Sequence, residues 1–118
     1  MLKKENRIKT RREMEEIKRE GYFLPGKRMG LLVGKAQEEG VKFGLIVSKK
    51  VSKKAVERNR GRRLAAGAIL ANKDKWREGW RLVFLAKRSF IDLKEAEAVK
   101  EIRELMEKVG EKNCVKNN

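Results

Sequence analysis

The chain has 118 residues, a length that suits one domain with a single modest core. Charged residues make up 42% of it and hydrophobic residues 40%, so we expect it to fold and not to stay disordered. Its net charge of +15 predicts an anionic partner, because such self-repulsion destabilises a compact domain unless a polyanion neutralises it. Nucleic acid and an acidic membrane surface are the two candidates. With no apolar run suited to a membrane helix and no secretory signal pattern, we expect a cytoplasmic protein that binds an intracellular polyanion and no membrane.

Several kinds of active site are excluded by residues that the sequence lacks. There is no histidine, so serine triads and His-ligated zinc sites cannot form. The one cysteine, Cys114, lies in a polar tail with no second thiol. We interpret it as an incidental thiol in a reducing compartment, with a reactive nucleophile as the alternative. No carboxylate cluster suggests a metal-dependent nuclease, so we expect neither catalytic residues nor a metal site in the protein.

The first half of the chain is predicted to hold one helix and up to three strands. Residues 1–9 form a basic lead-in, and Thr10 followed by Glu13 fits a capping box at the start of a helix. The segment QEEG favours a hairpin between the two longer strands. In chain order, the predicted elements are a helix over 11–20, a possible short strand over 22–24 and strands over 29–36 and 42–49.

The second half is predicted to alternate helix, strand and helix. A face of small residues indicates the first helix, the segment RLVFLAK a strand, and a periodic apolar face the last helix. These elements are a helix over 55–71, a strand over 81–87 and a helix over 92–109, followed by a tail over 111–118 that we expect to be disordered. The element order and the lack of an internal repeat indicate one α+β domain over residues 1–118, an α/β sandwich.

Positive charge is concentrated between the second long strand and the helix after it. From Ser48 to Arg63 there are eight basic residues and one acid, a net charge of +7, whereas residues 92–111 carry a net charge of −3. Helical spacing puts Gly61, Leu64, Ala65 and Ala68 on one side of the helix and Asn59, Arg62, Arg63 and Ala66 on the other. Because the run lacks interleaved acids and is rich in arginine, it predicts contact with nucleic acid and not merely a solvated helix face. The run alone does not choose RNA over DNA.

The same segment resembles the protein component of bacterial ribonuclease P. That family has a strand ending in Ser-Lys-Lys, a basic loop, Lys-Ala-Val, and a helix that opens with Arg-Asn-Arg and continues with Lys/Arg-Arg-Leu. The chain has, in this order, Ser48-Lys49-Lys50, Lys54-Ala55-Val56, Arg58-Asn59-Arg60 and Arg62-Arg63-Leu64. The resemblance implies a sandwich like the second domain of the fifth small-subunit ribosomal protein, with a left-handed βαβ crossover in place of the usual right-handed one.

The resemblance also implies a function and partners. The family's partner is a catalytic RNA that, with bound Mg²⁺, hydrolyses the phosphodiester at the 5′ end of mature tRNA and so removes the leader of precursor tRNA. The protein would bind this RNA and the leader while the RNA performs the chemistry, and no obligate protein partner is implied. The implied RNA-binding residues are Lys49, Lys50, Lys53, Lys54, Arg58, Asn59, Arg60, Arg62 and Arg63. The implied leader cleft, between the sheet and the first helix, includes Met14, Lys18, Leu32 and Lys87.

The chain departs from the family pattern at several positions. Met14, Lys18 and Leu32 stand where the family has aromatic residues, Ala66 stands for a basic residue late in the helix, and Gly61 stands for an aliphatic one. Since stacking on an aromatic ring contributes about 1–3 kcal/mol per base, we expect the cleft to hold the leader less tightly or to rely more on charge. Tyr22 and Phe23 could replace the lost rings from nearby, or could belong to the core.

Three other functions remain open from the sequence. A ribosome-associated RNA-binding protein would bind ribosomal RNA and sediment with ribosomal subunits. A DNA-binding architectural protein would place the helix over 55–71 in a groove of duplex DNA. An independent nuclease would cut precursor tRNA without any RNA subunit. Adding the protein to a bacterial ribonuclease P RNA and assaying 5′ processing at low Mg²⁺ separates these functions.

Overall fold

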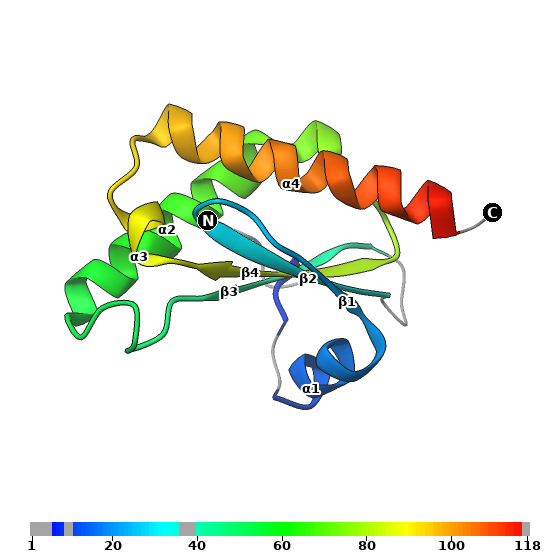
Figure 1. The fold of residues 1–118 in the computed structure, drawn as a ribbon, viewed down its shortest axis with the longest axis horizontal. Coiled ribbons are helices and arrows are strands. Elements are labelled where there is room, and N and C mark those ends of the chain that lie inside the picture. The colour runs from blue at the N-terminus through cyan, green and yellow to red at the C-terminus, as the bar shows by residue number, and fades with distance from the viewer. Residues whose placement is uncertain (1–5, 9–10, 36–39, 117–118) are drawn as a thin grey trace.

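One mixed sheet separates two layers of helices (Figure 1). The computed structural model describes residues 6–8, 11–35 and 40–116, with α1 on one face of the sheet and α2 and α4 on the other. Along the chain the elements are α1 (Arg11–Glu20), β1 (Tyr22–Leu24), β2 (Met29–Lys35), β3 (Lys42–Ile46), α2 (Ala55–Ala71), the 3₁₀ turn η2 (Lys73–Lys75), β4 (Trp80–Ala86), α3 (Arg88–Ile91) and α4 (Glu95–Lys116). The α+β sandwich expected from the sequence is confirmed.

The strand order β1-β2-β4-β3 shows that the predicted hairpin between β2 and β3 is wrong. β4 lies between those strands, antiparallel to β2, where Phe84 pairs with Leu31, and parallel to β3. β4 takes the centre because both of its faces are apolar, and Leu82, Val83 and Phe84 are all buried. Residues 36–39, which include most of the expected turn, lie outside the described residues. α2 joins the parallel pair β3–β4, and this is the crossover for which the resemblance implies a left-handed path.

The helix boundaries agree with the sequence where local patterns define them. α1 and α2 cover their predicted ranges. At the end of the chain, α3 is an additional short helix, and α4 runs from Glu95 to Lys116, so most of the expected disordered tail over 111–118 is helical. Extension of a helix is far easier than its nucleation, which accounts for the continuation. Thr10, the expected cap of α1, lies outside the described residues. Within the described part of the chain, every helix is too short or too polar to cross a bilayer.

The main core lies between the sheet and the layer of α2 and α4. Its largest fully buried side chains include Phe43, Phe84, Phe90, Ile69 and Ile102. α2 approaches closely because its inward residues are small. A Cβ at Gly61 would stand 3.2 Å from Ile91 Cγ1 and 3.4 Å from Val47 Cγ2. Gly61, Ala65 and Ala68 are all buried, so the predicted face of small residues is confirmed.

α1 covers only one end of the opposite face of the sheet. Ile17 is fully buried over Gly34, where a Cβ would stand 3.1 Å from Ile17 Cγ2. Arg81 of β4 is 4% exposed, and its guanidinium donates to the Lys35 carbonyl at 2.9 Å and to the Glu16 carboxylate at 3.2 Å. Because a buried guanidinium is strongly destabilising without partners, Arg81 needs both bonds, and the one to Glu16 holds α1 over that end of the sheet.

Glu57 ties the start of α2 to α3 and to the preceding loop. Its carboxylate accepts two hydrogen bonds from the Arg88 guanidinium, at 2.8 and 3.2 Å, and one from Ser52 Oγ at 2.5 Å. The hydrogen bonds from Arg88 and then from Ser52 lower the pKa of Glu57 from 4.5 to about 2. Its place in the first turn of α2 also matches the helix dipole. The one acid of the basic segment therefore orders that segment.

Replacing Gly67 by alanine is expected to stabilise the protein. Gly67 lies inside α2, and a Cβ there would meet nothing within 4 Å, so the change reduces backbone entropy in the unfolded chain without a clash. The expected gain in the free energy of unfolding is about 0.5–1 kcal/mol. Gly61→Ala is the matched control, because its Cβ would crowd Ile91, and it should gain less or destabilise. Urea unfolding measures the free energy of unfolding of both variants. Equal increases in the two variants would contradict the close packing at Gly61.

Glu57→Gln is expected to lower stability at neutral pH and to lose this effect in acid. The folded-state pKa of about 2 lies below the ordinary 4.5, so the stabilisation is complete above pH 4.5 and is lost as the pH falls through 2. The deficit of the Gln variant should therefore shrink between those two values. Thermal unfolding across this window measures the deficit, with the exposed Glu78→Gln as control. A deficit that is the same at every pH would contradict the role of the carboxylate.

Candidate nucleic-acid interface

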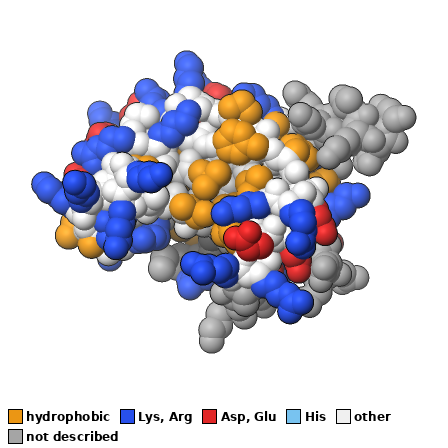
Figure 2. All heavy atoms as spheres, turned by 60° about the horizontal axis from the view of Figure 1, so that its bottom comes forward, with side chains coloured by type: hydrophobic (Ala, Val, Ile, Leu, Met, Phe, Trp, Pro, Cys, Tyr) orange, Lys and Arg blue, Asp and Glu red, His pale blue; other side chains and the backbone are white. Residues whose placement is uncertain are grey.

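The predicted RNA-binding residues of the β3–α2 loop and α2 lie together at one end of the molecule. We call them the basic surface: Lys49, Lys50, Lys53, Lys54, Arg58, Asn59, Arg60, Arg62 and Arg63. All are exposed except Arg58, which is half-buried. Figure 2 shows Lys and Arg side chains gathered at the left end, where Figure 1 places this loop and the start of α2. The fold thus joins the loop and the helix into one positively charged surface.

Some residues of the basic surface also maintain its shape. Arg58 Nη1 donates to the Ser52 carbonyl at 3.0 Å, which holds the loop against α2. Arg62 Nη1 donates to Asn59 Oδ1 at 2.5 Å, one helical turn away. Removing Arg58 would therefore disturb the loop as well as remove a charge. Arg63, for which the described residues include no such bond, is a cleaner probe of charge.

Within the described part of the chain, the charge of the basic surface is offset only slightly, by the electrostatic interaction of Lys54 with Glu57. No ion pair among the described residues involves its lysines or arginines, and Glu57 is bonded to Arg88 at 2.8 Å instead. Beside α4, by contrast, Arg103 pairs with Asp74 at 2.9 Å. Unpaired charges of one sign produce a local potential that attracts polyanions. The basic surface is therefore the part of the molecule best suited to phosphates.

On the face of the sheet that carries α1, the part that α1 leaves uncovered forms an apolar strip. Strand pairing places Phe23 beside Leu32, and places Leu85 between Gly30 and Ile46. We call Phe23, Leu32, Ile46 and Leu85 the open sheet face. Phe23 is 51% exposed and the other three are half-buried. Figure 2 shows hydrophobic side chains gathered on this side of the molecule, with Lys and Arg side chains around them.

Phe23 is the exposed aromatic ring of the open sheet face. A Cβ at Gly30 would stand 2.5 Å from Phe23 Cζ, so the ring lies directly over this glycine and would have to shift for any larger residue. Tyr22, the other candidate from the sequence, packs against the main core, and burial raises its pKa. Successive strand residues point to opposite faces, so the pairing of β1 with β2 decides which ring is exposed.

The structure brings together only part of the predicted leader cleft. Met14 is half-buried and reaches from α1 over Gly44, where a Cβ would stand 3.5 Å from Met14 Cε. Leu32 lies on the same side of the sheet, and Lys18 is exposed on α1. Lys87 follows the end of β4, and its Nζ donates to a carbonyl of the turn before β2 at 2.9 Å. Lys87 therefore holds a turn in place while its side chain stays exposed.

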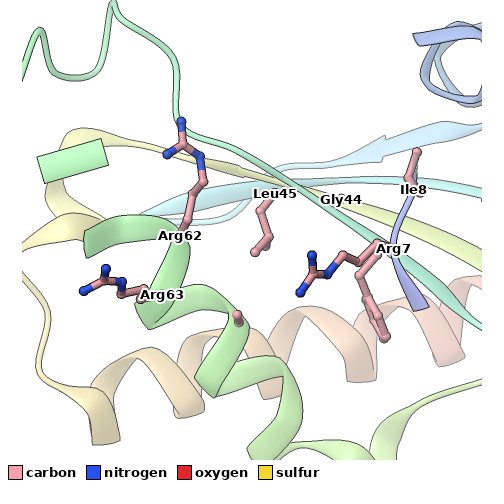
Figure 3. A pocket seen from close by; sticks show the side chains of 8 residues that line it. Arg7, Ile8, Gly44, Leu45, Arg62 and Arg63 are labelled. Atoms are coloured by element: carbon pink, nitrogen blue, oxygen red, sulfur yellow. The ribbon is translucent and has the colours of Figure 1, made fainter. Parts of the chain in front are cut away.

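A recess between α2 and the outer edge of β3 was missed by the sequence reasoning. It has a volume of about 240 Å³ and is lined by Arg7, Ile8, Phe43, Gly44, Leu45, Arg62, Arg63 and Ala66 (Figure 3). Ala66, expected on the outward side of the helix, is buried instead, because the N-terminal segment and β3 adjoin it here. The only sequence feature that pointed to a binding role for Arg7 was the basic character of residues 1–9, because no local pattern predicts that this segment lies against β3.

The surfaces described above are suited to binding a nucleic acid. In the described part of the chain, no three Asp, Glu or Cys side chains form a group that could hold a metal ion. The basic surface can bind phosphates, because guanidinium groups match their geometry. The open sheet face can receive bases, because an exposed ring stacks on any base. Together they suit a nucleic acid that has a structured part and a single-stranded part.

Comparison with known proteins gives the family. The family model Ribonuclease P matches residues 2–110. The ribonuclease P protein component of Clostridium botulinum (strain Loch Maree / Type A3) is 32% identical over 108 residues, which cover 91% of the chain and 96% of that protein. The one from Pelotomaculum thermopropionicum is 40% identical over 67 residues, 57% of the chain and 59% of that protein.

A solved structure shares the fold. The RNase P protein from Thermotoga maritima superposes with a TM-score of 0.77 at 21% identity, covering 86% of the chain and 96% of that protein. Because the family model matches residues 2–110, nearly the whole chain, the chain belongs to the ribonuclease P protein family.

Proposed function

We propose that the chain is the protein subunit of a cytoplasmic ribonuclease P holoenzyme, in which a catalytic RNA removes the 5′ leader of precursor tRNA. The basic surface binds the catalytic RNA, and the open sheet face receives the single-stranded leader. The observation that carries the proposal is a largely unneutralised basic surface adjoining an apolar strip with an exposed ring. β3 connects the two, since Ile46 lies on the open sheet face and Ser48 begins the basic loop.

Binding of the catalytic RNA through the basic surface follows from counterion release. Each phosphate that a lysine or arginine neutralises frees condensed cations, so affinity falls steeply as salt rises. The hydrogen bonds of Glu57 and Arg58 to Ser52 pre-order the loop, which reduces the entropy lost on binding. The surface is thus suited to the folded RNA subunit, where many phosphates lie close together.

The leader is proposed to lie along the open sheet face. Phe23 offers one stacking platform, and Leu32, Ile46 and Leu85 form an apolar floor beside it. This places the ring on an edge strand, whereas the family pattern has its rings on the first helix and on the strand position of Leu32. Lys18 on α1 adds a charge for the leader phosphates.

The chemistry of leader removal is assigned to the RNA subunit. Among the described residues, no three Asp, Glu or Cys side chains form a group that could hold Mg²⁺. The RNA subunit with its Mg²⁺ would supply the activated water and stabilise the leaving oxygen. The protein's own part is to bind phosphates, orient the leader and offset repulsion between two polyanions, which lowers the Mg²⁺ concentration needed for assembly.

Reconstitution with a bacterial ribonuclease P RNA tests this function. The protein should lower the Mg²⁺ concentration required for 5′ processing of precursor tRNA, and alone it should cut nothing. Arg63→Ala and Lys50→Ala should each weaken RNA binding and reduce the slope of log affinity against log salt by about 0.7–0.9, because each loses one phosphate contact.

Lys108→Ala, at an exposed position of α4, is the matched control for Lys50→Ala and should leave the slope unchanged. If Lys50→Ala and Lys108→Ala reduced RNA affinity and the salt slope equally, no localised RNA site would exist. Cleavage by RNA-free protein would contradict the assignment of the chemistry to the RNA. Binding restricted to ribosomal RNA or duplex DNA would favour the other functions that the sequence left open.

Phe23→Leu is expected to reduce the preference of the reconstituted complex for precursor over mature tRNA. Leucine keeps an apolar side chain over Gly30 but removes the ring, so the loss should equal one base stack, about 1–3 kcal/mol. The measurement is the ratio of the two tRNA affinities at one fixed salt and Mg²⁺ concentration. Val56→Ala, which truncates an 80% exposed apolar residue of α2, is the control. An unchanged ratio would mean that the leader does not lie along the open sheet face.

A further inference from the structure

The N-terminal segment forms one wall of the recess beside α2. Residues 6–8 follow the outer edge of β3 through a parallel bridge between Arg7 and Phe43. Ile8 N–H donates to the Phe43 carbonyl at 2.9 Å, and Asn6 Nδ2 donates to the Val41 carbonyl at 2.9 Å. These bonds on either side of Arg7 fix its backbone, so its side chain starts from a defined position at the recess.

The recess has an apolar floor and a rim of guanidinium groups. Leu45 and Ala66 line the floor, one from the sheet and one from α2. Figure 3 shows Arg7 directed across the recess toward Leu45 and α2, whereas Arg62 and Arg63 extend from α2 away from the floor. The residues that line the recess include three arginines and no acid. This lining suits a ligand with one planar apolar part and one anionic part.

The size of the recess limits the ligand further. Its volume of about 240 Å³ is below the roughly 300–1,000 Å³ typical of sites for drug-sized molecules, so it fits one small planar group. A nucleobase is such a group, and in RNA it is linked through its ribose to the phosphate backbone. Arginine can stack its guanidinium plane on a ring and can bind a phosphate with its fork. Arg7 is placed for the first role, and Arg62 and Arg63 are placed for the second.

We propose that the recess takes one unpaired nucleotide of the RNA that the basic surface binds. The base lies on Leu45 and Ala66 beneath Arg7, and its phosphates contact Arg62 and Arg63. Ala66 provides the space, because a long basic side chain, which the family pattern has at this position, would fill it. The inference rests on the proposed function for the identity of the RNA, whereas the chemistry of the recess stands by itself.

Two small probes test the recess in the isolated protein. Adenosine 5′-monophosphate and ribose 5-phosphate share a phosphate, but only the first carries a base. In methyl NMR spectra, the nucleotide should shift the signals of Leu45 and Ala66, and ribose 5-phosphate should not. In Ala66→Leu, which fills the floor without changing the charge, the shift at Leu45 should be lost. Equal shifts from both probes, or shifts that survive in the variant, would overturn the site.

The reconstituted complex tests whether the ligand belongs to the catalytic RNA. Ala66→Leu should weaken affinity for the RNA on the order of 5- to 100-fold, as expected for the loss of one base contact. Ala71→Leu, the same change at an exposed position of α2, should bind like the original protein. Circular dichroism checks folding, and Ala66→Met fills the same space with a more flexible side chain if the leucine variant unfolds.

The outcomes separate this inference from the proposed function. If the original protein supports processing and Ala66→Leu binds the RNA as Ala71→Leu does, the nucleotide site is overturned and the proposed function stands. If the original protein fails to support processing but the nucleotide still shifts Leu45 in preference to ribose 5-phosphate, the recess is retained as a nucleotide site and the proposed function falls.

Discussion

The position of β4 in the centre of the sheet is the constraint on which the other features depend. Its leucine, valine and phenylalanine side chains are buried on both faces of the sheet, and β4 lies between β2 and β3. Parallel pairing with β3 then requires a crossover, because two parallel strands cannot be joined by a tight turn. α2 is that crossover, and the loop that enters it is the basic loop. Core packing thus sets where the charge lies.

The small residues of α2 explain why the basic surface and the recess lie side by side. Gly61, Ala65 and Ala68 bring the helix close to the sheet, which leaves its arginines on the outer side. The same close approach makes the recess, since β3 and the N-terminal segment meet the helix at Ala66. On the other face of the sheet, the bond from Arg81 to Glu16 holds α1 at one end. The rest of that face is the open sheet face. The basic surface and the open sheet face therefore lie at different places around one sheet.

Local features could be predicted from the sequence, and features that depend on distant pairing could not. The ranges of α1 and α2 and the composition of the basic surface follow from spacing within a few residues. The hairpin prediction was wrong because residues 29–36 and 42–49 do not reveal a stronger partner many residues later. Ala66 was misplaced because only the fold brings residues 6–8 beside it. Tyr22 and Phe23 could not be ranked until the pairing of β1 was known.

The late place of β4 in the chain also has a consequence for how the protein is made. During synthesis, β1 and β2 can pair as soon as they emerge, but β2 and β3 have no common neighbour until residues 80–86 follow. Contacts between such distant segments slow folding, because a long loop must close before they form. Until then the nascent chain exposes its basic segment without a sheet to support it. The basic segment therefore takes its final position only after residues 80–86 have joined the sheet.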